Sequence, residues 1–164
     1  MSALVIRPAL VTDAALLLKL IRGLAEYEKL AHEVVATEAQ LAAELGARNP
    51  VAHALIAELD GAPAGFALYF FNFSTFLARR GLYLEDLFVL PGSRDQGIGR
   101  ALLVELARRA AAQGCGRMEW SVLDWNVDAQ RFYASLGARP MDGWTVHRMD
   151  RAAIAALGYD ESPR

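Results

Sequence analysis

The chain has 164 residues, of which 54% are hydrophobic and 22% are charged, and its formal net charge is -2 at pH 7. This length and composition exclude an intrinsically disordered chain and predict a single globular domain over residues 1–164 with a sizeable core. Because the net charge is slightly acidic, the basic patch typical of a nucleic-acid-binding protein is missing, and we expect no nucleic-acid partner.

The chain also shows no targeting or membrane signal. Its first residues lack the basic start and long apolar run of a secretion signal. The apolar run from Ala14 to Leu18 ends at Lys19, well short of a membrane span. The single cysteine, Cys115, has no intrachain disulfide partner, which indicates a reducing compartment. A buried, inert thiol is its simpler interpretation, and a nucleophile paired with a histidine has no local support. We therefore expect a cytoplasmic protein with no membrane partner.

The sequence predicts strands that come first as a hairpin and then alternate with helices. Strands are expected at 4–7, 53–59, 64–73, 82–89, 117–123 and 144–149, and helices at 12–27, 37–45, 98–112, 128–136 and 151–157. Thr12 is expected to cap the first helix, and Thr37 with Gln40 forms a capping box for the second. Asp60 and Gly61 predict a tight hairpin turn. The segment 28–36 between the first two helices is expected to be irregular and to line a cleft.

The strand at 64–73 is apolar on both of its faces. It should therefore be covered on both sides, by helices or by another subunit. Core packing is the simplest explanation of its aromatic residues, and an acceptor pocket or a dimer interface is the alternative.

The most informative stretch is the place where the apolar strand at 82–89 passes through a glycine-bearing turn into a helix. First-turn amides of a helix have no intrahelical partner, and the helix dipole adds about half a positive charge there, so an anion fits. Gly97 and Gly99 remove the Cβ atoms that would hold a phosphate away. Arg94 and Arg100 flank the turn and can contact phosphate oxygens. A turn that only connects a strand to a helix remains the simpler alternative.

Two well-known phosphate loops do not fit this turn. The sequence has no GxxxxGK[ST] motif, and Leu102 stands where a dinucleotide fold would have a third small residue. Neither a nucleoside triphosphatase nor a nicotinamide enzyme is favoured.

The turn does match the pattern R-x-x-G-x-G, which resembles the acetyl-CoA pyrophosphate loop of the GNAT acetyltransferase superfamily. Other segments resemble the branch of spermidine/spermine and thialysine acetyltransferases, and these are 6–9, 26–28, 83–86, 122–126, 131–133 and 143–144. The resemblance implies a GNAT-like α/β fold, a mixed, splayed β-sheet with helices on both faces. It also implies a homodimer that transfers an acetyl group directly from acetyl-CoA to a primary amine, without a metal.

The resemblance also implies where acetyl-CoA binds. In this superfamily the strand bulges near Leu87, Phe88 and Val89, and its exposed amides bind the thioester oxygen and pantetheine. The diphosphate and the pantetheine arm would then be bound by Arg94, Asp95, Gln96, Gly97, Ile98, Gly99, Arg100 and Asn126. Asp95 stands where the family commonly has glycine, and its carboxylate should weaken cofactor binding unless the side chain turns outward. The Val127-Asp128 pair replaces a common Glu-Pro pair, which weakens the expectation for Asn126.

Acetyl transfer to an amine requires a neutral amine and a proton for the departing thiolate. An alkyl amine has a free pKa of about 10.4, so a proton acceptor is needed. Glu85 and Asp86 are adjacent in an apolar strand and should point to opposite faces, because strand side chains alternate. The resemblance implies Glu85 as the base, directly or through water, Asp86 as its structural partner, and Tyr133 as the acid. The alternative is that both carboxylates are merely paired with arginines.

For the acceptor, the resemblance points to Tyr27, Glu28, Asp142 and Trp144, together with Glu85. The two further carboxylates would hold the far ammonium of a diamine or amino acid, and the aromatic rings its methylene body. Polyamines, diamines and the lysine analogue thialysine are the leading acceptors. Two alternatives remain: acetylation of a peptide or protein amine, which needs an open groove, and a non-catalytic protein that senses acyl-CoA.

Overall fold

The computed structural model describes residues 2–159 and divides into two compact units, 1–123 and 124–164. The strands of the first unit are β1 (Leu4–Pro8), β2 (His53–Leu59), β3 (Ala62–Ser74), β4 (Arg79–Val89) and β5 (Arg117–Glu119). Its helices are α1 (Ala14–Tyr27), α2 (Glu38–Leu45) and α3 (Ile98–Ala112), with 3-10 turns η1 (Val11–Asp13), η2 (Ala31–Glu33) and η3 (Pro91–Ser93). The second unit contains α4 (Val127–Ser135) and α5 (Arg151–Gly158).

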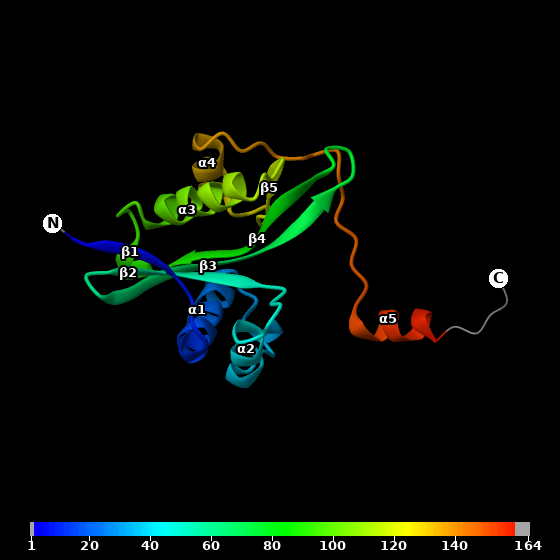
Figure 1. The fold of residues 1–164 in the computed structure, drawn as a ribbon, viewed down its shortest axis with the longest axis horizontal. Helices are drawn as coiled ribbons and strands as arrows, with labels where there is room; N and C mark the ends of the chain where they lie inside the picture. Colours follow the sequence, from blue (N-terminus) through cyan, green and yellow to red (C-terminus); the bar gives the residue numbers. More distant parts are fainter. Residues whose placement is uncertain (1, 160–164) are drawn as a thin grey trace. The chain divides into compact units, whose positions relative to one another are not determined.

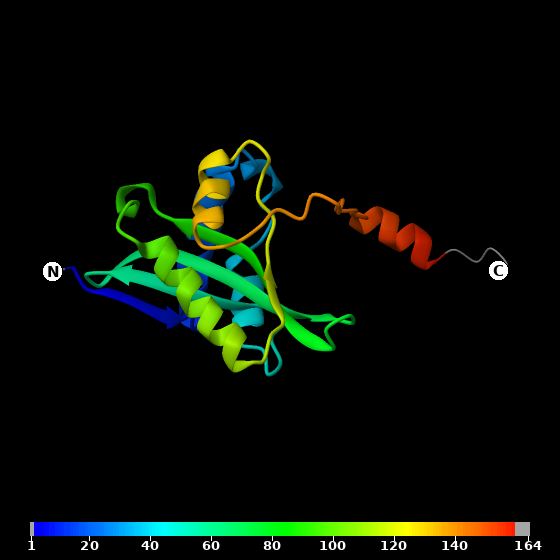
Figure 2. The ribbon, with the colours of Figure 1, turned by 90° about the horizontal axis from the view of Figure 1, so that it is seen from above.

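The first unit is built on an open sheet with the strand order β1-β2-β3-β4-β5. The first four strands are antiparallel, whereas β5 runs parallel to β4. Helices α1 and α2 lie on one face of the sheet and α3 lies on the other (Figure 1, Figure 2). β5 pairs with β4 only along Gly81 to Tyr83, which leaves the rest of β4 without a strand on that side among the described residues. This confirms the expected mixed, splayed sheet with helices on both faces.

The core between α1 and the sheet fixes the register of the central strands. Leu17 and Leu20 of α1 are almost fully buried against Ile56, Phe66 and Phe88 of the sheet. Burying side chains of this size contributes about 1.5–3 kcal/mol each. A slip of one residue along β3 or β4 would turn these side chains to the opposite face, so the core strongly disfavours it.

Three local sequence signals are confirmed, at the start of α2, at the β2–β3 turn and at the end of α3. Thr37 accepts a hydrogen bond from the Gln40 amide at 3.3 Å and completes the capping box of α2. Asp60 and Gly61 adopt φ values of 52° and 79° between β2 and β3, as a tight hairpin turn requires. Helix α3 has the expected bounds, and Gly114 follows it at φ 65°.

The start of α1 differs from the expectation. Asp13, not Thr12, is the N-cap residue, after the 3-10 turn η1. The Asp13 carboxylate accepts hydrogen bonds from the Leu10 amide at 2.7 Å and from the Arg7 guanidinium at 2.7 and 3.0 Å. A bidentate charged contact of this kind is stronger than a hydroxyl cap. The carboxylate therefore fixes the entry to the helix, and the Thr12 expectation is wrong.

Two expected strands also differ. β5 ends at Glu119 instead of reaching Leu123, and residues 144–149 form no strand. A β-branched, alternating sequence needs a partner backbone to become a strand. Within the described residues no strand pairs with 144–149, and Trp144 and Val146 are 77% and 79% exposed.

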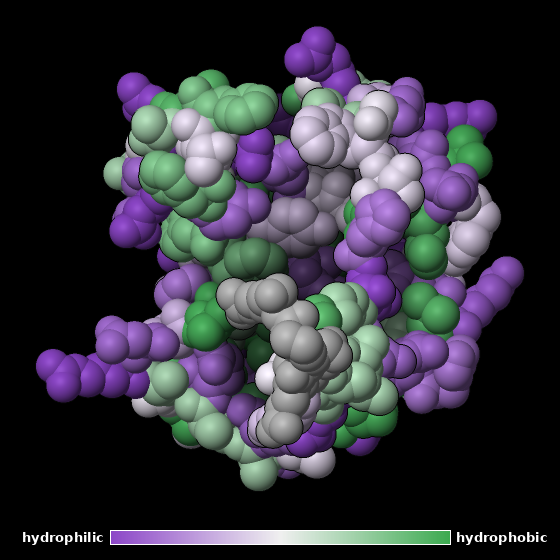
Figure 3. All heavy atoms as spheres, turned by 90° about the vertical axis from the view of Figure 1, so that its right-hand side faces the viewer, coloured by the Kyte–Doolittle hydropathy of each residue, from purple (hydrophilic) through white to green (hydrophobic). Residues whose placement is uncertain are grey.

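Two further properties concern only the described residues. Every helix within 2–159 is too short or too polar to cross a bilayer. Hydrophilic and hydrophobic side chains are interspersed over the molecular face shown in Figure 3.

Candidate active site

Strand β4 carries a bulge at Glu85, directly before Asp86. Leu84 pairs with Tyr69 of β3, and Asp86 pairs with Leu68, so two steps along β4 match one step along β3. Directly paired side chains share a face, and consecutive β3 residues alternate, so Asp86 lies on the Leu68 face. Glu85 is the extra residue, and a bulge sets both carboxylates opposite a single partner residue. Because strict alternation fails at a bulge, the register does not assign a face to Glu85, and the expectation that Glu85 and Asp86 point to opposite faces stays a prediction.

The bulge lies two residues before its expected position near Leu87, Phe88 and Val89. From Leu87 to Val89 the register with β3 is regular. The reason is packing, because Phe88 pairs directly with Phe66, and both rings are buried in the core beneath α1. The irregularity is therefore placed where the outward side chain, Glu85, is exposed.

Asp86 lies in an acidic environment together with Glu85 and Glu28. Burial first, and then the charges of Glu85 and Glu28, raise the pKa of Asp86 to about 6. Burial also raises the pKa of Glu28, which follows directly after α1. Among residues 2–159, none of these carboxylates forms an ion pair with an arginine or lysine. The arginine-pairing alternative therefore has no support, and the site favours a cationic ligand.

We expect Asp86→Asn to stabilise the folded chain at pH 8. The folded-state pKa of about 6 lies above the ordinary value of 3.8 for an aspartate. Ionisation of Asp86 therefore opposes folding increasingly as the pH rises from about 3.8 to 6, fully above pH 6, and not below about pH 3.8. A shift of this size corresponds to about 3 kcal/mol in the free energy of unfolding. Urea denaturation at pH 8 and pH 3 tests this, with the exposed Glu85→Gln variant as a control that should gain less. An equal gain at both pH values would contradict the electrostatic explanation.

The glycine turn before α3 leaves the start of the helix without a side-chain cap. Gly97 is the N-cap residue at φ 76°, and a Cβ built there would meet nothing within 4 Å. Because glycine has no side chain, the first-turn amides of α3 receive no side-chain cap from it. Asp95 adopts φ 60°, a left-handed conformation that favours glycine and that aspartate tolerates better than most residues. The turn can therefore accept Asp95 where the family commonly has glycine.

The free edge of β4 lies next to this turn. Beyond Tyr83, no described strand pairs with β4 on its β5 side, and the Val89 carbonyl accepts a hydrogen bond from Arg94 instead. Among the expected cofactor residues, Phe88 has a ring that is 5% exposed and packs in the core, so its side chain is closed to a ligand. Leu87 and Val89 are half-buried and point to the face opposite Phe88.

Arg94 is already engaged within the chain. Its guanidinium carbon lies 4.7 Å from the centre of the Tyr27 ring and 5.9 Å from that of Phe88. Its Nε donates a hydrogen bond to the Val89 carbonyl at 3.2 Å. The expected cofactor residue Arg94 and the expected acceptor residue Tyr27 thus contact each other, a link that the sequence gave no reason to expect.

Four of the expected residues lie in the second unit. Asn126 is buried and caps α4, accepting a hydrogen bond from the Ala129 amide at 3.2 Å. Tyr133 is half-buried on α4, and its ring centre lies 5.4 Å from that of Phe132. Asp142 and Trp144 lie in the irregular segment between α4 and α5. Asn126 therefore has a structural role in the helix, whatever else it binds.

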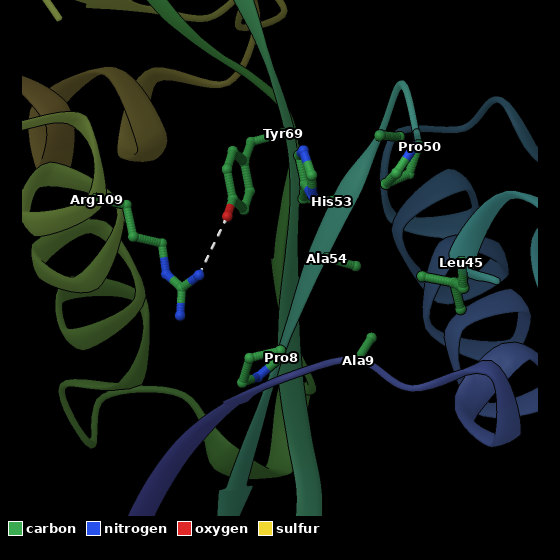
Figure 4. A pocket seen from close by; sticks show the side chains of 9 residues that line it. Pro8, Ala9, Leu45, Pro50, His53, Ala54, Tyr69 and Arg109 are labelled. Atoms are coloured by element: carbon green, nitrogen blue, oxygen red, sulfur yellow. Dashed lines mark hydrogen bonds between the residues drawn. The ribbon is translucent and has the colours of Figure 1, made fainter. Parts of the chain in front are cut away.

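Two small pockets lie in the first unit. One, of about 170 Å³, is lined by Arg22, Glu26, Ala31 and Val34, so the segment 28–36 does line a pocket. The other, of about 100 Å³, lies where β1 leaves β2, and Tyr69 accepts a hydrogen bond there from Arg109 at 3.3 Å (Figure 4). None of the expected site residues lines either pocket.

Comparison with known proteins identifies the family. The model of the Acetyltransferase (GNAT) family matches residues 19–138. The chain belongs to this family. The GNAT chain is 39% identical to a thialysine N-epsilon-acetyltransferase of Sus scrofa, over 96% of this chain and 98% of that protein. It is 32% identical to an L-ornithine N5-acetyltransferase of Arabidopsis thaliana, over 93% of this chain and 86% of that protein.

A solved structure gives the same assignment of the fold. An integron cassette protein from the mobile metagenome of V. cholerae superposes with a TM-score of 0.79 at 25% identity, covering 96% of this chain and 98% of that one. The resemblance to GNAT acetyltransferases of the thialysine branch is confirmed, and the chain is an N-acetyltransferase. The enzymes of this family use acetyl-CoA as the co-substrate.

Proposed function

We propose that this GNAT enzyme acetylates a primary amine of a small acceptor that carries more than one positive charge. Diamines, polyamines and basic amino acids, including the lysine analogue thialysine, form this class. The observation that carries the proposal is the set of carboxylates Glu28, Glu85 and Asp86, which share an acidic environment without a counter-cation among residues 2–159. Uncompensated carboxylates at a partly buried site are stabilised when an ammonium group binds there.

The named acceptors of the relatives support this class. Thialysine and L-ornithine are both amino acids with a second amine on the side chain, and the corresponding relatives are 39% and 32% identical to this chain. An acceptor of this kind presents one ammonium for reaction and one for recognition. Asp142 and Glu28 would bind the distal charge, and Tyr27 and Trp144 would contact the methylene body.

The catalytic roles follow from the charges of the groups. Glu85 would accept the proton of the amine, directly or through water, because its carboxylate is exposed and open to an amine that enters from solvent. Asp86 beside it would hold the reacting ammonium in place. Tyr133 would donate a proton to the departing thiolate. A phenol has a pKa of about 10 and a thiol one of about 8.5, and a phenol held within hydrogen-bonding distance can still protonate the thiolate as its charge develops.

Acetyl-CoA supplies the acetyl thioester when bound, and the chain offers groups that fit it. The diphosphate would lie on the amides of 96–99 at the start of α3, near the cationic Arg94 and Arg100. The open space at the Gly97 Cβ position is suited to an approaching phosphate. The free edge of β4 at 87–89 and Asn126 would bind the pantetheine arm. A single functional domain over 1–164, a homodimer and a cytoplasmic location remain predictions.

An amine panel tests the proposed function. Thiol release from acetyl-CoA is followed with diamines, spermidine, ornithine, thialysine, a monoamine and a peptide with a free amino terminus. Turnover with small multiply charged amines supports the proposal. A preference for the peptide would favour the protein-acetylating alternative, and tight acetyl-CoA binding without turnover of any amine would favour the sensor.

We expect Glu28→Gln to raise KM for a diamine about three- to tenfold and to leave KM for a monoamine nearly unchanged. The reason is that Glu28 would contact only the distal ammonium, and one charge-assisted hydrogen bond is worth about 1 kcal/mol at a partly exposed site. Steady-state kinetics with both amines measure the effect. The matched control is Glu26→Gln, an exposed carboxylate on α1. An identical increase of KM for both amines would count against the assignment.

A further inference from the structure

The contact between Arg94 and Tyr27 joins two segments. The proposed function assigns the diphosphate of acetyl-CoA to the turn that contains Arg94 and the acceptor amine to the end of α1 that contains Tyr27. Arg94 follows η3 and leads into the glycine turn, and Tyr27 is the last residue of α1. The guanidinium lies 4.7 Å from the Tyr27 ring centre, within the range of a cation-π interaction. Nε also donates to the Val89 carbonyl at 3.2 Å. One side chain thus touches α1, the end of β4 and the turn before α3.

The contact is continuous with the core on one side. Arg94 lies 5.9 Å from the Phe88 ring centre, and a Cβ built at Gly23 of α1 would come within 2.9 Å of the same ring. Phe88 is therefore held closely against α1, and Arg94 stacks beyond it. A movement of the turn would be transmitted to the last turn of α1 through packed rings and not through solvent.

Tyr27 connects the contact with Arg94 to the acidic site formed by Glu28, Glu85 and Asp86. Tyr27 immediately precedes Glu28, whose charge acts on Asp86, and Asp86 lies two residues before Phe88 on β4. The position of the Tyr27 ring therefore affects the place where the acceptor amine would bind. Arginine suits this bridging position because its planar guanidinium can stack on an aromatic face and still donate hydrogen bonds from its edge.

We propose that Arg94 is a positioning residue that couples the cofactor turn to the acceptor end of α1 by stacking on Tyr27. This inference rests on the proposed function, because it assigns both ends of the contact to that reaction. In this arrangement the guanidinium stays on Tyr27 when coenzyme A binds, and the turn amides bind the diphosphate. Loss of either Arg94 or Tyr27 loosens the turn and, at the same time, shifts the acceptor site.

A double-mutant cycle with coenzyme A as the probe tests this coupling. Isothermal titration calorimetry on the full chain should show that Arg94→Met and Tyr27→Leu each raise Kd by about two- to fivefold, the value expected for one exposed cation-π contact. The double variant should raise Kd no further. Tyr27→Phe, which keeps the ring, should retain the wild-type Kd. At saturating acetyl-CoA, Arg94→Met should also raise KM for a diamine about two- to fivefold.

Arg100→Met provides the control, because the exposed Arg100 flanks the same turn without a described stacking partner. Its effect on Kd should add to that of Tyr27→Leu. Additive effects of Arg94→Met and Tyr27→Leu, or an unchanged Kd in Tyr27→Leu, would overturn the coupling and make Arg94 a direct phosphate ligand. A wild-type chain that does not bind coenzyme A would instead overturn the proposed function itself.

Discussion

Tyr133→Phe is expected to lower kcat by about 100- to 10,000-fold, the range for loss of one general acid. The substitution removes only the phenol oxygen, so the half-buried ring of Tyr133 and its contact with Phe132 remain. The affinity for acetyl-CoA should therefore change little. Single-turnover thiol release measures the chemical step, and calorimetry with coenzyme A measures binding.

The matched control is Tyr159→Phe, which removes the same oxygen from a side chain that is 86% exposed in the same unit. Its kcat should equal the wild-type value. A Tyr133→Phe variant whose losses in kcat and in coenzyme A affinity are similar would show that the hydroxyl serves binding and not proton donation.

Arg7→Met is expected to destabilise the folded chain. Arg7 donates to Asp13 at 2.7 and 3.0 Å and to Glu58 at 2.9 Å, and the Asp13 side chain is only 12% exposed. Removing the cation leaves a nearly buried carboxylate unpaired, which costs about 3–5 kcal/mol in a fully buried pair. Because the Arg7 side chain is 31% exposed, we expect about 2 kcal/mol here.

The pH dependence separates this charge effect from lost packing. The hydrogen bonds from Arg7 lower the pKa of Asp13 below 3.8, so its stabilising contribution is present above that pH and is lost as the pH falls through the folded-state pKa. The difference between Arg7→Met and the wild type should shrink between pH 7 and pH 3 in urea denaturation. Arg48→Met, at an exposed arginine without a described ion pair, should have little effect. A loss that stays constant with pH would indicate packing.

The elements predicted correctly are those with a local cause. The bounds of α3 follow from the glycines that flank it, with Gly97 and Gly114 both at positive φ. The hairpin at Asp60 and Gly61 follows from the backbone freedom of those two residues. The R-x-x-G-x-G pattern was sufficient to indicate the family for the same reason, since its chemistry lies in consecutive backbone amides.

The errors concern features that depend on distant residues. The bulge at Glu85 arises because Phe88 is locked opposite Phe66 while Leu84 is paired with Tyr69, and neither constraint is visible within β4 alone. Residues 144–149 have the composition of a strand and lack a partner edge among the described strands. Periodicity describes the side chains of a segment, whereas pairing is decided by the backbone that lies beside it.

By itself, the sequence determined the family, the order of most elements and the glycine turn, because these depend on neighbours within a few residues. Only the tertiary structure brought Glu28 close enough for its charge to act on Asp86, and only it stacked Arg94 on Tyr27. These relations depend on strand register and on the packing of α1 against β4. They join residues far apart in the chain, and the free energy that fixes them comes from a core that no single segment contains.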